Sequence, residues 1–547
     1  MKSKRLTLSV LFVVAAVANA LACTNLIVGK NASADGSTIV SYSADSYGLF
    51  GELYHYPAGM HKKGTLIDIH EWDTGKYLGQ IEQARQTYNV IGNMNEFQLT
   101  IGETTFGGRP ELVDTTGIID YGSLIYLGLQ RSRTAREAIK VMTELVQEYG
   151  YYSGGESFTI ADPNEIWIME MIGKGPGVRG AVWVAVRVPD DCISAHANQS
   201  RIHQFNMNDK ENCMYSPDVI SFAREKGYFD GVNKDFSFAN AYAPLDFGAR
   251  RYCEARVWSY FNMFTDRGNE FLPYILGETN TPMPLFVKPN RKVSVQDVKN
   301  AMRDHYEGTP LDISKDFGAG PYHTPYRLSP LSFKVGDREY FNERPISTQQ
   351  SGFVFVAQMR SELPDPIGGV LWFGTDDANM TVFTPVYCCT DKVPVCYTRV
   401  DGADYITFSW NSAFWIFNWV ANMVYPRYDL MMGDVRATQT ELETTFNEAQ
   451  EGVEAAAAKL LEKDPAKAKA FLTNYTNMTA QSTFDTWKRL GEFLVVKYND
   501  GVVKRMKNGQ FERNSIGQPA GVIRPGYPKE FLEEYVKQTG DRYKMPE

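Results

Sequence analysis

The N-terminal segment places the tightest constraint on what this 547-residue chain can fold into and where it acts. A basic start is followed by an almost wholly apolar run over residues 6–18, and residues 20–22 (Ala-Leu-Ala) lead directly to Cys23. This succession is typical of a secretory signal peptide with its cleavage site. We therefore predict that residues 1–22 are removed and that the mature chain, exported to the periplasm or the extracellular space, begins at Cys23.

Composition excludes several other classes of protein. With 43% hydrophobic and 22% charged residues, the chain is an ordinary globular mixture. Its net charge of −9 without basic runs argues against nucleic-acid binding, which requires clustered Lys and Arg. No membrane span is predicted, because the leader run is shorter than the ~20 residues that a spanning helix needs. The best later run, over residues 414–424, contains two asparagines.

Cys23 would carry a free thiol and a free α-amine once the chain is cut. An α-amine has a pKa of ~7.7–8.0, so it can accept the thiol proton near neutral pH without help from a histidine. The sequence therefore predicts an N-terminal cysteine nucleophile. Seven cysteines leave at least one unpaired, for which we nominate Cys23. The other six either form up to three disulfides or stay reduced and buried.

A lipid-anchored protein is the alternative interpretation of a cysteine that follows a signal peptide. Lipidation would consume the thiol and usually the amine. Lipoprotein signals tend to have Leu three residues before the cysteine, where this chain has Ala20, and a flexible tether after it. Here Cys23 runs straight into an apolar strand pattern over residues 24–29, which suits a rigidly held nucleophile.

The remaining pattern predicts an α+β protein. Strand patterns cover residues 24–29 and 38–41, then 157–161, 165–171 and 181–188, and finally 352–359 and 369–373. A helix is predicted over residues 134–149, with Thr134 and Glu137 as a capping box and Gly150 at its end. Residues 215–345 are loop-rich, and residues 436–498 are helical with a restart at Asp464-Pro465. We predict a catalytic domain over residues 23–435 and a C-terminal helical region over residues 436–547, packed on it.

Other catalytic motifs are weak or missing from the sequence. Residues 175–180 match G-x-G-x-x-G, but a strand pattern follows them instead of the helix that a dinucleotide site needs, so a hairpin loop is the better interpretation. The seven histidines are scattered without metal-ligand spacing, and His196 and His203 are interpreted as structural. No metal or organic cofactor is predicted.

Short motifs along most of the chain resemble one enzyme family. They are residues 23–30 (CTNLIVGK), 34–38 (ADGST), 92–96 (GNMNE), 103–105 (ETT), 186–191 (VRVPDD), 197–202 (ANQSRI), 251–252 (RY), 256–258 (RVW), 318–321 (GAGP, a looser match), 324–327 (TPYR) and 368–374 (GGVLWFG). In this order they resemble the secreted and cytosolic dipeptidases related to the secernins. That family belongs with choloylglycine hydrolases and penicillin V acylases among the N-terminal nucleophile (Ntn) hydrolases.

The resemblance implies a fold and a core of catalytic residues. The fold is a four-layer αββα Ntn-hydrolase sandwich, here with additional loops and the C-terminal helical region. Cys23 would be the nucleophile and its α-amine the base. Asp45 matches the acid that orients the amine, and Asn198 matches the asparagine that holds the oxyanion. Arg251 best matches the later active-site arginine, with Arg256 as the fallback.

Two further positions are implied as substrate or oxyanion contacts. Thr105 falls, by ungapped spacing from Asn95-Glu96, where bile-salt hydrolases place a second oxyanion donor, and Asn95 is kept as a candidate with it. One departure concerns Tyr42, which stands where the family commonly has an arginine three residues before the acid. A phenol cannot lower a thiol pKa by its charge, so either another cation such as Arg251 substitutes or the enzyme is slower or differently tuned.

Together these observations predict an exported cysteine-type amidohydrolase, most simply a dipeptidase acting on small peptides through an acyl-enzyme. An acylase acting on bile-salt conjugates, penicillin V or other N-acyl amides is the alternative with the same fold. A lipid-anchored surface-binding protein with an inactive hydrolase fold is the alternative of another class. The sequence does not indicate an oligomeric state.

Overall fold

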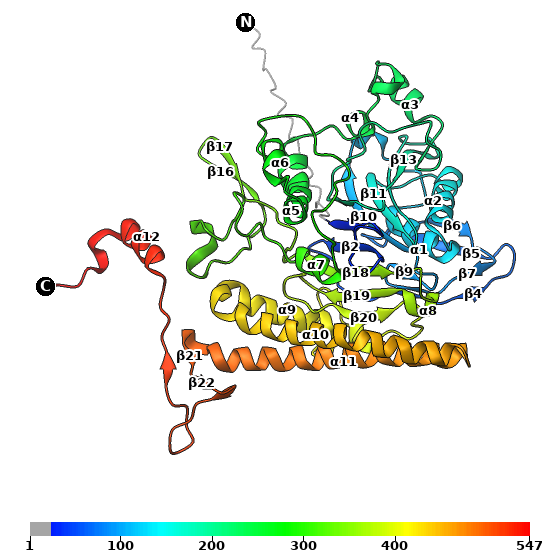
Figure 1. Ribbon diagram of the computed structural model, residues 1–547. Helices are drawn as coiled ribbons and strands as arrows, with labels where there is room; N and C mark the ends of the chain where they lie inside the picture. Colours follow the sequence, from blue (N-terminus) through cyan, green and yellow to red (C-terminus); the bar gives the residue numbers. More distant parts are fainter. Residues whose placement is uncertain (1–22) are drawn as a thin grey trace, which may run out of the picture.

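Two antiparallel β-sheets form the centre of the protein in the computed structural model, which describes residues 23–547 (Figure 1). The predicted signal peptide lies outside these described residues. The six-stranded sheet has the order β14 (Ile193–His196), β1 (Asn25–Val28), β2 (Thr38–Asp45), β18 (Ser351–Met359), β19 (Val370–Thr375) and β20 (Thr384–Tyr387). The eight-stranded sheet has the order β15 (Cys213–Tyr215), β13 (Ala181–Arg187), β12 (Ile166–Gly173), β11 (Gly155–Ala161), β10 (Thr100–Gly107), β9 (Met94–Asn95), β8 (Val90–Ile91) and β3 (His55–Tyr56). With the helices below, the chain has the predicted α+β class.

The two sheets face each other where β1 and β2 contact β10. Side chains of β1, β2, β12 and β18 are buried along the whole of each strand, because these strands are covered on both sides. Asn25 Nδ2 donates a hydrogen bond of 2.7 Å to the carbonyl oxygen of Glu103, which ties β1 to β10. A Cβ atom at Gly102 would lie 2.4 Å from Asn25 Oδ1, so only glycine permits this close approach. The junction lies beside the start of β1, where Cys23 sits.

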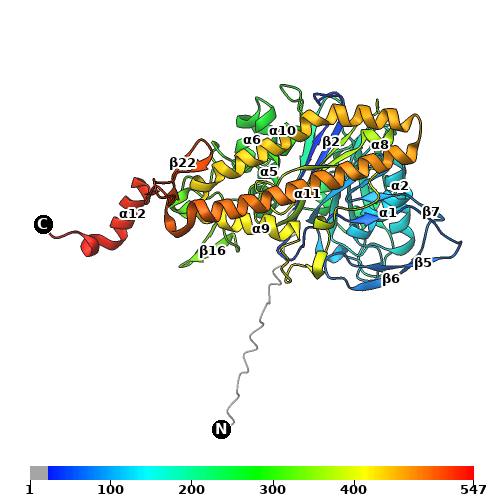
Figure 2. The same cartoon turned by 90° about the horizontal axis from the view of Figure 1, so that it is seen from below.

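Helices cover the sheets on their outer sides (Figure 2). Helix α1 (Tyr121–Arg131) contacts β10, and α2 (Ala135–Tyr149) contacts β11, β12 and β13. The predicted helix is confirmed as α2, because the Thr134 side chain accepts a hydrogen bond from Glu137 N and Gly150 is the C-cap. The predicted capping box is only half formed, since the Glu137 carboxylate accepts from Arg133 N and not from Thr134 N. On the other sheet, α5 (Ala255–Phe264) contacts β14 and α7 (Val295–Ala301) contacts β18.

Two long antiparallel helices lie under the six-stranded sheet (Figures 1 and 2). They are α10 (Tyr428–Leu461) and α11 (Pro465–Tyr498), and α11 contacts both β20 and α9 (Ala413–Val424). Asp464 caps α11 by accepting hydrogen bonds from two backbone N–H groups, and Pro465 occupies its first turn as the sequence predicts. The domain boundary predicted after residue 435 falls inside α10 and stays a prediction.

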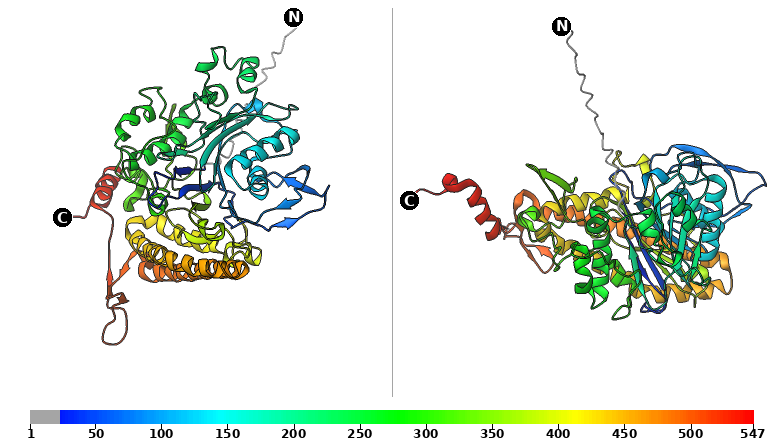
Figure 3. Two further views of the ribbon diagram at one scale, coloured as in Figure 1. Left: turned by 45° about the vertical axis from the view of Figure 1, so that its right-hand side comes forward. Right: turned by 90° about the horizontal axis from the view of Figure 1, so that it is seen from above.

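Shorter elements complete the chain. The remaining helices are α3 (Val219–Glu225), α4 (Phe238–Tyr242), α6 (Gly268–Ile275), α8 (Asp365–Gly368) and α12 (Lys529–Thr539). Two-stranded pairs are β4 (Gly59–Met60) with β7 (Gln86–Thr87), β5 (Leu66–His70) with β6 (Tyr77–Glu82), β16 (Ser332–Val335) with β17 (Arg338–Phe341), β21 (Val503–Lys504) with β24 (Val522–Ile523), and β22 (Met506–Lys507) with β23 (Gln510–Phe511). Residues after α11 run outward from the end of that helix (Figure 3), and α12 contacts the turn Phe317–Tyr322, where the rings of Phe317 and Phe531 stack.

Most predicted strands are present with shifted ends. The G-x-G-x-x-G motif at residues 175–180 forms the turn between antiparallel β12 and β13, which confirms the hairpin interpretation. No helix within residues 23–547 is long and apolar enough to cross a membrane.

Candidate active site

Cys23 lies at the beginning of β1, between the two sheets. Cys23 exposes only 3% of its surface. The next residue, Thr24, forms an antiparallel β-bridge with Ser43 of β2. The Cys23 thiol lies 3.5 Å from Glu103 Oε1 of β10 and 3.6 Å from the Tyr42 hydroxyl of β2. Strands of both sheets therefore hold the sulfur in place, as a nucleophile requires.

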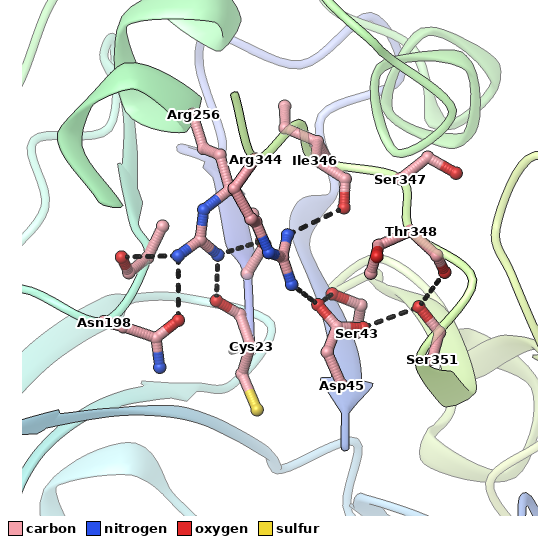
Figure 4. A network of polar contacts seen from close by, with 12 residues as sticks. Cys23, Ser43, Asp45, Asn198, Arg256, Arg344, Ile346, Ser347, Thr348 and Ser351 are labelled. Carbon is pink, nitrogen blue, oxygen red and sulfur yellow. Dashed lines mark hydrogen bonds and ion pairs between the residues drawn. The ribbon is translucent and has the colours of Figure 1, made fainter. Parts of the chain in front are cut away.

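Arg256 connects Cys23 to the segment that follows β14. This side chain is 1% exposed, and all five of its N–H groups are used. They donate to Tyr252 O (2.7 Å), Cys23 O (2.6 Å), Thr24 Oγ1 (2.8 Å), Ala197 O (3.0 Å) and Asn198 Oδ1 (2.9 Å) (Figure 4). The planar guanidinium thus fixes the backbone of Cys23 and the amide of Asn198 relative to one another.

Asn198 has a left-handed backbone, with φ of 62°, two residues after β14 ends. Asparagine tolerates this conformation better than most residues because its short polar side chain bonds locally. Asn198 Oδ1 accepts a hydrogen bond from Arg256, and Asn198 Nδ2 donates a hydrogen bond of 2.8 Å to the carbonyl oxygen of Thr105. The amide plane is therefore held from both ends, with its nitrogen on the side of β10.

Asp45 ends β2 and is buried with an arginine that the sequence did not indicate. Its carboxylate accepts from Arg344 Nη2 at 2.5 Å, from Ser351 Oγ at 2.6 Å and from Ser43 Oγ at 3.1 Å. The Arg344 and Arg256 side chains lie next to each other, between Cys23 and Asp45 (Figure 4). Two guanidinium groups therefore lie near Cys23 although residue 42 is a tyrosine, one bonded to the Cys23 carbonyl oxygen and the other to Asp45.

The electrostatics of the site disfavour a thiolate before any cut. Burial is the largest cause that raises the pKa of the Cys23 thiol well above its usual value, and the negative charges of Glu103 and Asp45 add to it. The backbone N–H of Asp45 and the Tyr42 hydroxyl act in the opposite direction, with a smaller effect. The thiol therefore needs a nearby base to take its proton.

Histidine does not supply that base. His196 is fully buried, with its ring nitrogens 2.7 Å from Thr104 Oγ1 and from Thr159 Oγ1, and burial lowers its pKa to about 3. His203 bonds Ser237, and burial lowers its pKa to about 4. None of the hydrogen bonds that the described residues make with the Cys23 thiol comes from a histidine.

The other residues predicted for the site lie in different surroundings. Arg251, in the π-helical turn Ala249–Glu254, forms an ion pair with Glu343 instead of contacting Cys23, and the fallback Arg256 takes that position. Thr105 contributes its carbonyl oxygen to Asn198, and its hydroxyl donates to Glu156. Asn95 stabilises a turn, because its amide bonds four backbone groups, of Phe97, Leu99, Leu129 and Ser132.

Sequence reasoning missed three acidic or basic neighbours of the nucleophile. Glu103 lies in one of the motifs that resemble the dipeptidase family, but no role was predicted for it. No sequence pattern pointed to Glu156 or Arg344. Arg344 is 299 positions from its partner Asp45, so only the pairing of β18 with β2 brings its segment to the site.

The described residues also bear on metals and disulfides. Within residues 23–547, no group of three or more His, Cys, Asp or Glu side chains is arranged to hold a metal ion. All seven cysteines lie in this range, and each is a free thiol. Of the two possibilities left open for the six other cysteines, the structure therefore has the reduced one.

Comparison with known proteins agrees with this arrangement. Residues 22–55 and 50–441 match the sequence pattern of peptidase family C69. The chain belongs to peptidase family C69. A probable dipeptidase of Salmonella dublin is 30% identical over 387 residues, which cover 67% of this chain and 81% of that protein. Dipeptidase A of Lactobacillus helveticus is 24% identical over 416 residues, covering 72% and 80% of the two chains.

The family match and these relatives confirm the resemblance to dipeptidases that the sequence motifs indicate. A third relative, a dipeptidase of Bifidobacterium longum, is 25% identical over 418 residues, covering 68% of this chain and 72% of that protein. The matched region contains Cys23, Asp45, Asn198 and Arg256 together. It also contains every strand of both sheets, so the match spans the candidate site and its scaffold.

Proposed function

We propose that this C69 peptidase is a dipeptidase that uses Cys23 as an N-terminal nucleophile. One observation carries the proposal: Arg256 holds the backbone of Cys23 and the amide of Asn198 in one network, beside the ion pair of Asp45 with Arg344. A nucleophile, an amide donor and an acid next to the nucleophile are the groups that acyl transfer requires. The dipeptidase names of its relatives support the substrate class.

In the proposed reaction, the α-amine of Cys23 takes the thiol proton and the sulfur forms a bond to the carbonyl carbon of the scissile amide. The negative charge passes to the carbonyl oxygen, where an N–H of Asn198 stabilises it. The C–N bond then breaks as the ammonium returns its proton to the leaving amine. Water, activated by the same amine, attacks the thioester and releases the second product together with the free thiol.

The fold supports membership of the Ntn hydrolases. Two facing antiparallel sheets, with α1 and α2 on one outer side and α9, α10 and α11 on the other, fit the four-layer αββα sandwich that the sequence resemblance implies. In this arrangement the nucleophile stands at the start of a central strand, as Cys23 stands at the start of β1.

The proposal includes export and removal of residues 1–22, since the base exists only when Cys23 is the first residue. The alternatives of an acylase and of a lipid-anchored protein remain outcomes of the experiment below.

The decisive experiment compares two chains that differ by one residue. Residues 23–547, produced with a fully removed initiator methionine, should hydrolyse dipeptides, and the same chain with one extra residue before Cys23 should fold but stay inactive. Cys23→Ala should be inactive in both formats. Full turnover by the extended chain would refute the N-terminal nucleophile. Hydrolysis of acyl amides but of no dipeptide would favour the acylase, and an added acyl mass on the exported protein would favour the lipid anchor.

A further inference from the structure

Two buried glutamates beside the nucleophile lack a cation. Glu103 and Glu156 are 1% and 0% exposed, and none of the Lys or Arg residues in the described chain forms an ion pair with either. Other buried carboxylates of this protein do pair with arginine. These pairs are Asp45 with Arg344, Glu254 with Arg201, Glu443 with Arg303 and Glu454 with Arg360.

The hydrogen bonds of the two glutamates are also incomplete. Glu103 Oε1 accepts from the Tyr42 hydroxyl at 2.5 Å and from the Cys23 thiol, and Glu156 Oε1 accepts from Thr105 Oγ1 at 2.6 Å. The carboxyl groups contact each other, which allows them to share one proton and leaves one negative charge on the pair. Apart from this contact between the two carboxyl groups, no N–H or O–H of residues 23–547 donates to Glu103 Oε2 or Glu156 Oε2, although both atoms are buried. A buried charge without a partner is unfavourable unless a ligand completes it.

We propose that the Glu103–Glu156 pair binds the α-ammonium group of the substrate's first residue. This inference rests on the proposed dipeptidase function and assigns the subsite that selects a free N-terminus. In a dipeptide the ammonium nitrogen lies ~2.5 Å from the scissile carbonyl carbon, two bonds away. A sulfur in position to attack is ~3–3.5 Å from that carbon. These distances allow a carboxylate oxygen 3.5 Å from the Cys23 sulfur to come within hydrogen-bond reach of the ammonium.

The ionisation of the pair agrees with this role. Burial is the main cause that raises the pKa of Glu103 to about 7, and the charge of Asp73 adds to it, while hydrogen bonds from Tyr42, Glu156 and Cys23 lower it. Tyr121 of α1 also faces the group, and its hydroxyl donates to Asp73. The ammonium group of a bound substrate would favour the charged form of Glu103, so Glu103 would lose its proton when the substrate binds.

The subsite would separate dipeptides from acyl amides. An apolar acyl group offers no cation and leaves the carboxylate buried without a partner. Sites built to bond a polar substrate group reject analogues that lack the group by roughly 10⁴-fold. The wild-type mature enzyme should therefore prefer L-alanyl-L-alanine to N-propionyl-L-alanine, which has the same scissile amide without the amine, by about that factor.

Glu103→Gln tests the assignment, because it keeps the shape of the side chain and removes its charge. The ratio of kcat/KM for L-alanyl-L-alanine to that for N-propionyl-L-alanine should fall about 10- to 100-fold, the contribution of one charged hydrogen bond. Glu156→Gln should change the ratio in the same direction. Glu170→Gln is the matched control: Glu170 is also buried with a pKa of about 7, but it accepts from Ser200 and from two backbone N–H groups. The control should leave the ratio unchanged.

Binding provides a second measurement that does not depend on turnover. Calorimetry on mature Cys23→Ala protein should show L-alanyl-L-alanine binding that weakens about 10- to 100-fold when Glu103→Gln is added. Equal loss of activity on both substrates would mean that Glu103 acts on the nucleophile, and would overturn the subsite. An unchanged ratio with dipeptide hydrolysis intact would overturn the subsite alone. Failure of the wild-type enzyme on every dipeptide would instead refute the proposed function.

Discussion

Arg256→Lys tests how far the active site depends on one buried guanidinium. The arginine donates five hydrogen bonds to buried oxygen atoms, and a lysine ammonium has three hydrogens, so at least two acceptors lose their donor. Each buried polar group left unpaired costs ~1–3 kcal/mol. The substitution should therefore lower the free energy of unfolding by about 2–6 kcal/mol.

Activity should fall more than stability alone explains. Because Cys23 and Asn198 share this one partner, its loss lets the proposed nucleophile and the proposed oxyanion donor move relative to each other. A displacement of about 1 Å costs roughly 10²-fold in rate. Urea unfolding gives the stability change, and kcat on a dipeptide, measured where the variant is fully folded, gives the catalytic change.

Arg360→Lys is the matched control. Arg360 is also buried and donates to Glu454 and to the carbonyl oxygens of Ile367 and Gly368, away from Cys23. It should lose stability to a similar degree and keep kcat. If Arg256→Lys matched the wild type in both measurements, or if both variants lost kcat equally, the network around Arg256 would not position the catalytic groups.

Three further results are expected. Asn198→Gly, which removes the amide while accepting the φ of 62°, should lower kcat by about 10²- to 10³-fold with little change in the urea midpoint, and near-wild-type kcat would remove Asn198 from the site. Thiol titration in denaturant without reductant should give seven thiols per chain, and five or fewer would reveal a disulfide. The kcat/KM for dipeptides should fall as the pH drops below the Glu103 pKa of about 7, because the protonated carboxyl no longer attracts an ammonium. Protonation of the Cys23 α-amine should lower kcat/KM for both substrates, so the dipeptide profile should fall more steeply below the Glu103 pKa than that of N-propionyl-L-alanine, and identical profiles would place the whole titration on the nucleophile.

Local sequence signals predicted the parts of the fold that depend on local chemistry. The Thr134 cap and the terminal glycine define α2, and the apolar runs define β1 and β12, because these strands are buried along their whole length. The long hairpin of α10 and α11 was only partly anticipated: its restart at Asp464 follows from capping chemistry, but α10 begins at Tyr428, before the predicted helical region.

The residues of the candidate site likewise fall into those that the sequence predicted and those that only the structure shows. Cys23 and Asn198 could be selected because each lies in a short motif, and Asp45 because it matches the acid of the family; the structure brings all three into one network (Figure 4). Arg251 was preferred to Arg256 from motif matching, but a π-helical turn precedes α5 and changes which arginine points toward Cys23. Arg344 and Glu156 reach the site through strand pairing across long chain separations, which no local pattern records.

The carboxylates around Cys23 would affect its thiol differently before and after the proposed cut. In a chain with a peptide bond before Cys23, burial and the charges of Glu103 and Asp45 hold the thiol in its neutral form. The proposed cut creates an amine two bonds from the carbon that carries the sulfur. As an ammonium, it opposes the effect of both carboxylates on the thiol, and as a free amine it takes the thiol proton. Glu103, whose charge disfavours the thiolate in the uncut chain, would then attract the ammonium of an incoming dipeptide after the cut.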